Sequence, residues 1–326
     1  MIYFLFVLGF FVLIKGADLL VNGASSIAKR FKINDLVIGL TIVAFGTSAP
    51  ELFVNISASL NGSSEIAVGN ILGSNIANIL LILGVSATIK TLQVSSSTVW
   101  KEIPFSLLAV IVLGFLANDR IIDGASLSQL SRIDGLIFIC FFVIFIYYII
   151  EISKKSKNSG IAEEVSSIKP MSIFKSLTFI LLGLLGLVFG GEWIVNGAIK
   201  IAENAGISKS LIGLTIVAVG TSLPEMATSV VAVYKGKNDI AIGNVVGSNI
   251  FNVFWILGVS SIIKPLPFQP SCNVDIMVAI LSSFLLFIFL FIGQRHNIQR
   301  GQGIMFLLIY VLYVVYLVLT DGNKIA

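Results

Sequence analysis

The sequence predicts an all-α integral membrane protein of ten transmembrane helices, arranged as two inverted repeats of five helices. Two observations carry this prediction. Hydrophobic residues make up 56% of the 326 positions and charged residues only 12%, which leaves too few polar side chains to cover a water-soluble globule. One stretch also occurs twice, because the segments 38–51 and 212–225 are identical at 12 of 14 positions.

The shift that carries 38–51 onto 212–225, which we call the repeat offset, relates further segments without a gap. It aligns 21–24 with 195–198, 66–78 with 240–252, and 82–86 with 256–260. The two copies share their polar part, which consists of Thr, Ser, Asn, Pro and Glu inside segments that are apolar enough to cross a bilayer. Polar and ionisable residues are costly at such positions and are typical of a transport pathway.

Apolar runs of about 20 residues, the length that crosses a bilayer, predict the positions of the helices. They lie near residues 2–24, 35–60, 66–89, 102–117, 133–151, 173–199, 210–234, 240–263, 274–293 and 303–320. The first run has no Ala-x-Ala cleavage pattern, so we interpret it as a retained helix and not as a signal peptide. A polar linker, 152–171, separates the first five-helix repeat, 1–151, from the second, 172–326.

The distribution of basic residues predicts the orientation in a cell (plasma) membrane. If the N-terminus is outside, 14 Lys and Arg residues fall in cytoplasmic segments and six fall outside. The positive-inside rule therefore places both termini outside and the linker 152–171 in the cytoplasm. Because five helices per repeat is an odd number, the second copy must enter the membrane from the opposite face, and the repeats are inverted.

Several function classes are disfavoured by composition. The two cysteines, Cys140 and Cys272, match neither a disulfide framework nor a metal-ligand spacing. The net charge of +4 comes mostly from loop Lys and Arg and gives no argument for nucleic-acid binding. A chain with one His and no HExxH or Ser/His pattern is not expected to be an enzyme. We expect no cofactor and no obligate protein partner, only the lipid bilayer and transported ions.

The polar residues that are most informative surround a predicted helix break. Pro50 has no N–H to donate to the carbonyl of Gly46, so the second helix should bend there and free carbonyl oxygens. Glu51 follows the break directly, and Thr47 and Ser48 lie on the same face of the helix, four and three residues before it. The other copy repeats the pattern with Thr221, Ser222 and Glu225.

A second polar stripe lies in the third helix, where Asn70, Ser74 and Asn78 recur at intervals of four. The other copy supplies Asn244, Ser248 and Asn252. For any single Ser or Thr, a bond to the i−4 carbonyl or simple helix packing is an equally good explanation. Lys15 and Asp18, three residues apart in the first helix, are expected to pair, although Glu192 stands at the position of Asp18 in the other copy.

Two intramembrane carboxylates need compensating charge. The four helices that carry these motifs contain no Lys, Arg or His to pair with Glu51 and Glu225, so the partner must be a bound cation or protons. Hydroxyl, amide and carbonyl oxygens suit hard ions such as Ca²⁺ and Na⁺. Two bidentate carboxylates and two freed carbonyls supply about six oxygens, the lower end of what Ca²⁺ takes.

The paired segments GTSAPE and GTSLPE, with GNILGSNIAN and GNVVGSNIFN, resemble the two alpha repeats of the sodium/calcium exchanger family within the calcium:cation antiporters, in its prokaryotic form. The resemblance covers essentially the whole chain. It implies a ten-helix fold with cation sites at the bilayer centre, reached alternately from either side as the first and sixth helices slide across the rest. Glu51 and Glu225 resemble the carboxylates shared by calcium and sodium. The remaining ligands that it implies are the side chains of Thr47, Ser48, Ser74, Asn78, Thr221, Ser222 and Ser248 and the main-chain carbonyls of Ala44 and Ala218.

One position departs from the family pattern. Many members carry Asp where Asn252 stands, so this site has one carboxylate fewer and leaves the stoichiometry and the driving ion open. The predicted function is a secondary antiporter that exchanges Ca²⁺ for Na⁺ by alternating access at a midplane site. A Ca²⁺/H⁺ antiporter is the alternative. A passive cation channel is less favoured, because two buried carboxylates should hold Ca²⁺ too tightly for fast conduction.

Overall fold

The computed structural model of the chain describes residues 2–61, 65–158, 170–204 and 218–322, and these are almost entirely helical. Among them, eight helices are long and apolar enough to cross a membrane, or nine if one bent pair counts as a span. Each coincides with a helix predicted from the sequence, so the all-helical membrane fold is confirmed. The predicted seventh helix, 210–234, begins outside the described residues. Most of the predicted linker, 152–171, also lies outside them.

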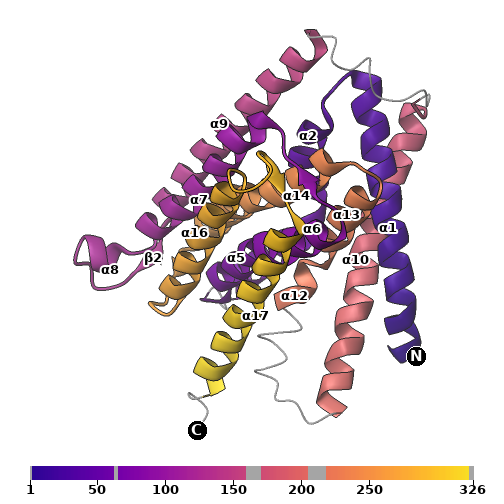
Figure 1. Cartoon of the computed structure of the whole chain (residues 1–326). Helices are drawn as coiled ribbons and strands as arrows, with labels where there is room; N and C mark the ends of the chain where they lie inside the picture. The colour runs from indigo at the N-terminus through magenta and orange to yellow at the C-terminus, as the bar shows by residue number, and fades with distance from the viewer. Residues whose placement is uncertain (1, 62–64, 159–169, 205–217, 323–326) are drawn as a thin grey trace.

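The helices run between two faces of the molecule. α1 (Ile2–Phe31) begins and α17 (Arg300–Gly322) ends at the same face, which we call the terminal face. α9 (Arg132–Asn158) ends and α10 (Ile173–Asn204) begins at the opposite face, the linker face (Figure 1). α9 continues as a helix beyond the predicted boundary at 151, because the Lys-rich residues that follow are good helix formers.

The second span is broken as predicted. It consists of α2 (Asp35–Ile38), the π-helical turn η1 (Gly39–Val43), α3 (Ala44–Thr47) and α4 (Ala49–Asn61), and it bends by 45° between α3 and α4. The break lies at Ser48, with φ −83° and ψ 7°, two residues before Pro50. In the second copy Ser222 separates α12 (Ala218–Thr221) from α13 (Leu223–Tyr234) with nearly the same angles, φ −89° and ψ 5°.

The next span of each copy contains a π-helical turn that starts at an asparagine. In the first copy α5 (Glu65–Ala77) is followed by η2 (Asn78–Leu83) and α6 (Gly84–Ile89). In the second copy α14 (Asn238–Phe251) is followed by η6 (Asn252–Leu257) and α15 (Gly258–Ile263), and the repeat offset carries each turn onto the other. Turns of this kind are rare and frequently mark functional sites.

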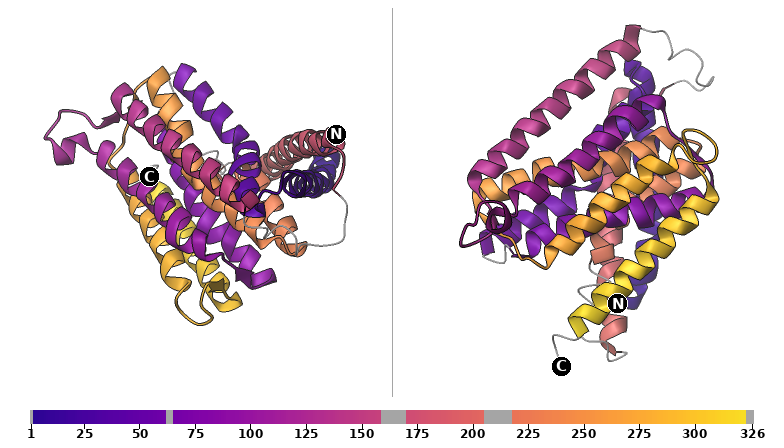
Figure 2. Two further views of the ribbon diagram at one scale, coloured as in Figure 1. Left: turned by 90° about the horizontal axis from the view of Figure 1, so that it is seen from above. Right: turned by 60° about the vertical axis from the view of Figure 1, so that its left-hand side comes forward.

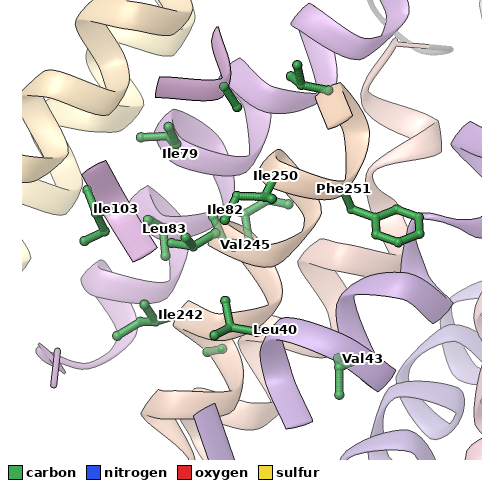
Figure 3. Close-up of a cluster of buried hydrophobic side chains, with 14 of the residues drawn as sticks. Leu40, Val43, Ile79, Ile82, Leu83, Ile103, Ile242, Val245, Ile250 and Phe251 are labelled. Carbon is green, nitrogen blue, oxygen red and sulfur yellow. The ribbon is translucent and has the colours of Figure 1, made fainter. Parts of the chain in front are cut away.

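These two spans form the centre of the molecule. In their most apolar 18-residue windows 72% and 78% of residues are buried, whereas the other unbroken spans bury 22–39%. Apolar side chains of the two copies pack directly together there, with Ile82 and Leu83 beside Ile242 and Val245, and Leu40 of η1 close by (Figure 3). η3 (Thr98–Glu102), α7 (Ile103–Leu116) and α16 (Cys272–Phe289) pack around this core. The short helix α8 (Asp119–Ile122) lies in a connection that projects from the edge of the molecule (Figure 1).

Two short antiparallel sheets join the halves of the chain. β1 (Leu92–Gln93) pairs with β4 (Asn297–Ile298), and β2 (Gln129–Leu130) pairs with β3 (Leu266–Pro267). In each sheet one strand comes from a connection in the first half and the other from a connection in the second half. The two halves are therefore hydrogen-bonded to each other outside the helices as well as packed within them.

α1 and α10 form a separate antiparallel pair at one edge of the molecule (Figures 1 and 2). Glycines allow their backbones to touch: a Cβ on Gly16 would lie 2.8 Å from the carbonyl oxygen of Gly183, and a Cβ on Gly183 would lie 2.6 Å from the nitrogen of Leu20. The same close approach recurs where Gly9 meets Gly190. Small residues give membrane helices this kind of tight interface, so α1 and α10 are built as one unit.

Candidate cation-binding site

The two helix breaks place Glu51 and Glu225 in the buried centre of the protein. Glu51 lies in the first turn of α4 and Glu225 in the first turn of α13, and each is 1% exposed. Both positions are at the start of a helix, where the macrodipole favours a negative charge. The two carboxylates are close enough to repel each other, and neither has an ion-pair partner among the described residues. The two carboxylates therefore lie near each other without a basic side chain from the described residues to balance their charge.

Hydroxyl groups of one half of the chain donate hydrogen bonds to buried polar side chains of the other half. Ser48 Oγ donates a hydrogen bond to Glu225 Oε1 at 3.0 Å, and Thr47 Oγ1 donates to Asn244 Oδ1 at 3.0 Å. On the other side of the site, the Thr221 hydroxyl interacts with the Glu51 carboxylate. Each glutamate is thus positioned by a hydroxyl that comes from the opposite repeat.

Four asparagine side chains fix one another at the crossing of α5 and α14. Asn75 and Asn249 each donate to the main-chain carbonyl of the other, at 3.3 and 3.4 Å. Asn78 Nδ2 donates to Asn249 Oδ1 at 2.9 Å, and Asn252 Nδ2 donates to Asn75 Oδ1 at 3.0 Å. These bonds use the amide nitrogens of Asn78 and Asn252. The oxygen of each amide is therefore available to bind another group.

Seven buried oxygens of this region have no hydrogen-bond partner within the described residues. They are Glu51 Oε2, Glu225 Oε2, Ser74 Oγ, Ser248 Oγ, Asn78 Oδ1, Asn252 Oδ1 and Ser222 Oγ; of these, Ser74 lies near the Glu51 carboxylate but outside hydrogen-bond geometry. The first six make three pairs related by the repeat offset. A buried oxygen left unsatisfied costs about 1–3 kcal/mol, so a set of seven calls for a ligand that accepts electron density from oxygen. A hard cation has this property.

The ligand chemistry favours Ca²⁺ and Na⁺. Every candidate donor is a carboxylate, hydroxyl, amide or carbonyl oxygen, as such ions prefer. The described residues contain no group of three or more His, Cys, Asp and Glu side chains placed so as to hold a metal ion. The charged groups at the centre are the carboxylates of Glu51 and Glu225, and the other candidate donors are neutral oxygens.

The structure brings most of the predicted site residues together. The side chains of Thr47, Ser48, Ser74, Asn78, Ser222, Ser248 and Asn252 are each at most 2% exposed, and Thr221 is half-buried. Ala44 is also buried, but its carbonyl already accepts bonds from Ser48 N at 3.0 Å and Thr47 Oγ1 at 3.3 Å, so an ion would have to share it. Ala218 is the first residue of α12, and the geometry of its side chain lies outside the described residues.

Two features were missed or misjudged from the sequence. Asn75 and Asn249 were not singled out, although both are identical in the two copies, because the interval of four selected Ser74 and Ser248 beside them. The expected pairing of Lys15 with Asp18 is wrong. Lys15 is exposed, and Asp18 Oδ1 instead lies 2.6 Å from Lys235 Nζ, because the connection between α13 and α14 approaches this face of α1.

Broken helices around a buried, oxygen-lined centre are typical of membrane transporters. The family model for the sodium/calcium exchanger protein matches residues 1–151 and 175–319, which is most of the chain. The chain belongs to the sodium/calcium exchanger family.

Individual relatives agree with this assignment along nearly their whole length. The chain is 39% identical to the putative antiporter CaxA of Alkalimonas amylolytica over 314 residues, 94% of this chain and 95% of that protein. It is 30% identical to the sodium/calcium exchanger MaX1 of Methanosarcina acetivorans, over 97% of this chain and 98% of that protein. A structure of the sodium-calcium exchanger NCX_Mj soaked with Na⁺ and Ca²⁺ superposes with a TM-score of 0.81 at 34% identity, covering 96% of this chain and 97% of that one.

Proposed function

We propose that the protein is a secondary antiporter that exchanges Ca²⁺ for Na⁺ by alternating access at the site around Glu51 and Glu225. The observation that carries this proposal is the set of three repeat-related pairs of buried oxygens without partners among the described residues, which includes one oxygen of each glutamate. Two ionised carboxylates match the charge of one Ca²⁺. The proposed ligands are the twelve residues predicted above, from Ala44 to Asn252.

Sodium is favoured over protons as the counter-ion. Apart from the two glutamates, the proposed ligands are neutral hydroxyl, amide and main-chain oxygens, which do not titrate near neutral pH but can bind Na⁺ directly. Proton exchange would have to run through the glutamate pair alone. Sodium ions that compete for the carboxylates would make occupancy by Ca²⁺ and Na⁺ mutually exclusive, as exchange requires.

The proposed architecture is ten membrane helices in two inverted repeats, in a cell membrane, with both termini outside. It is supported by the recurrence of the breaks at Ser48 and Ser222 and of the π-helical turns at Asn78 and Asn252. For alternating access we propose that the α1–α10 pair slides against the rest of the molecule. The glycine contacts that join these two helices backbone to backbone favour movement as one body.

The test is release of ⁴⁵Ca²⁺ from preloaded proteoliposomes, with pH and membrane potential clamped. We expect external Na⁺ to drive release, whereas an acid step without Na⁺ should not. Release driven by acid but not by sodium would identify a Ca²⁺/H⁺ antiporter. Release that does not saturate and needs no counter-ion would identify a channel.

A further inference from the structure

A pair of polar side chains occurs at matching positions on α1 and α10. Asp18 and Asn22 lie four residues apart on α1, and the repeat offset carries them onto Glu192 and Asn196 on α10. Residues four apart in a helix share one face, so each pair presents a carboxylate and an amide oxygen side by side. Neither pair belongs to the central site described above.

On α1 this pair holds a cation supplied by the chain itself. Lys235 Nζ lies 2.6 Å from Asp18 Oδ1 and 2.6 Å from Asn22 Oδ1, and it also donates to the Asp18 carbonyl at 3.3 Å. The ammonium group thus sits between the carboxylate and the amide oxygen. On α1 the carboxylate and amide oxygens therefore share one positively charged group, on the side of the linker face.

On α10 the equivalent pair lines a cavity. The cavity has a volume of about 310 Å³, and its wall includes Glu192, Asn196, Pro50 and Thr221. Glu192 is exposed, and the described residues provide no hydrogen bond or ion pair to its carboxylate. The residue that aligns with Lys235 in the first copy is Asn61, so the sequence supplies no ammonium group at the equivalent position.

The cavity adjoins the central site through one wall residue. Thr221 is part of its wall and also interacts with the Glu51 carboxylate. The wall residues on α10 run from Val188 to Asn196, in the half of the helix nearer the terminal face. A cation held at Glu192 would therefore lie on the terminal-face side of the glutamate pair, with Thr221 between the cavity and the Glu51 carboxylate.

We propose that Glu192 and Asn196 form a recruiting site that captures the transported cation at the terminal face before it reaches Glu51 and Glu225. This inference rests on the proposed exchange function. One carboxylate and one amide supply far fewer than the roughly 6–8 oxygens of a complete Ca²⁺ site, so the ion stays largely hydrated and moves on. The single negative charge raises the local cation concentration, more strongly for Ca²⁺ than for Na⁺. On the linker face Lys235 fills the equivalent position in this conformation.

The test is the Ca²⁺ dependence of the initial rate of Na⁺-driven ⁴⁵Ca²⁺ uptake into proteoliposomes, at low and at high ionic strength set with choline chloride. Glu192→Gln should raise the KM for Ca²⁺ about threefold to tenfold at low ionic strength and leave the maximal rate unchanged. The shift should shrink at high ionic strength, where salt screens an exposed charge. Glu192→Asp keeps the charge and should restore the wild-type KM. The matched control is Glu203→Gln, the same change on α10 at a residue outside this cavity that pairs with Lys200.

An unchanged KM in Glu192→Gln at low ionic strength would overturn the recruiting role. An equal shift at both ionic strengths would do the same, because it would indicate a structural effect of the substitution. Both outcomes require a wild-type protein that exchanges Ca²⁺ for Na⁺. Absence of exchange in the wild type would instead refute the proposed function, so the two failures are distinguishable.

Discussion

Asn75 and Asn249, which the repeat offset carries onto each other, each donate a side-chain hydrogen bond to the main-chain carbonyl of the other. Such a reciprocal contact between equivalent residues occurs where two copies of a motif cross on a local two-fold axis. It places the start of η2 against the end of α14 and the start of η6 against the end of α5, and the amide nitrogens of Asn78 and Asn252 bond to Asn249 and Asn75. The four asparagines thus form one hydrogen-bonded group at the crossing of the two copies.

Neutralising either central glutamate should abolish exchange. Glu51→Gln or Glu225→Gln removes one of the two charges that balance Ca²⁺, and we expect the Na⁺-driven Ca²⁺ flux to fall at least about 100-fold, since the lost charge-assisted contact alone is worth about 3 kcal/mol. The variants should still insert and purify. The control is Glu151→Gln, the same change in an exposed pair with Lys154 at the end of α9. Near-normal flux in both variants would refute the site assignment.

Removing the side-chain amide of Asn75 should destabilise the protein. Asn75→Leu leaves Asn252 Nδ2 and Asn249 O without the bonds they make to this side chain, at about 1–3 kcal/mol for each buried group. We expect a lower midpoint of thermal unfolding in detergent. We also expect added Ca²⁺ to raise this midpoint less than it does in the wild-type protein. Asn70→Leu, on the same helix, is the control, because the Asn70 amide nitrogen has no partner within the described residues. Equal midpoints for the two variants would contradict a structural role for the reciprocal contact.

A methyl group between α1 and α10 should disturb their packing. In Gly16→Ala the new Cβ would lie 2.8 Å from the Gly183 carbonyl oxygen and from the Leu187 nitrogen, which are main-chain atoms that cannot rotate away. We expect a loss of about 1–3 kcal/mol in stability or a slower maximal exchange rate, measured by thermal unfolding and ⁴⁵Ca²⁺ flux. Gly301→Ala on α17 is the matched control, since its Cβ would have no neighbour within 4 Å. Full activity and stability of Gly16→Ala would show that the two helices separate readily.

The orientation can be tested with cysteines at the two faces. In a background lacking Cys140 and Cys272, Lys154→Cys at the end of α9 should react with an impermeant thiol reagent only from the cytoplasm. Lys200→Cys near the end of α10 should react only from outside. Both lysine side chains are well exposed, 67% and 48%, so access does not limit labelling. The reverse pattern would invert the proposed topology and leave the repeat relationship intact.

The sequence by itself determined the class of fold and the position of the helix breaks. Runs of about 20 apolar residues follow from the thickness of the bilayer and need no knowledge of neighbours. The breaks follow from the covalent structure of Pro50 and Pro224, which lack an N–H wherever the chain goes. The duplication placed a second glutamate at the position equivalent to Glu51, and the absence of basic residues from these helices indicated a cation.

Only the tertiary structure decided which groups meet. The bonds from Ser48 to Glu225 and between Asn75 and Asn249 join residues from opposite halves of the chain, and no local pattern specifies them. The ion-pair partner of Asp18 is an example. Helix spacing favoured Lys15, but in the folded protein Lys235 Nζ lies 2.6 Å from Asp18 Oδ1. An exposed lysine on the same helix gains little from a pairing in water, whereas a connection packed against α1 delivers its ammonium to two oxygens at once. The crossing of the two copies therefore determines the partners, because it sets distances that sequence separation leaves open.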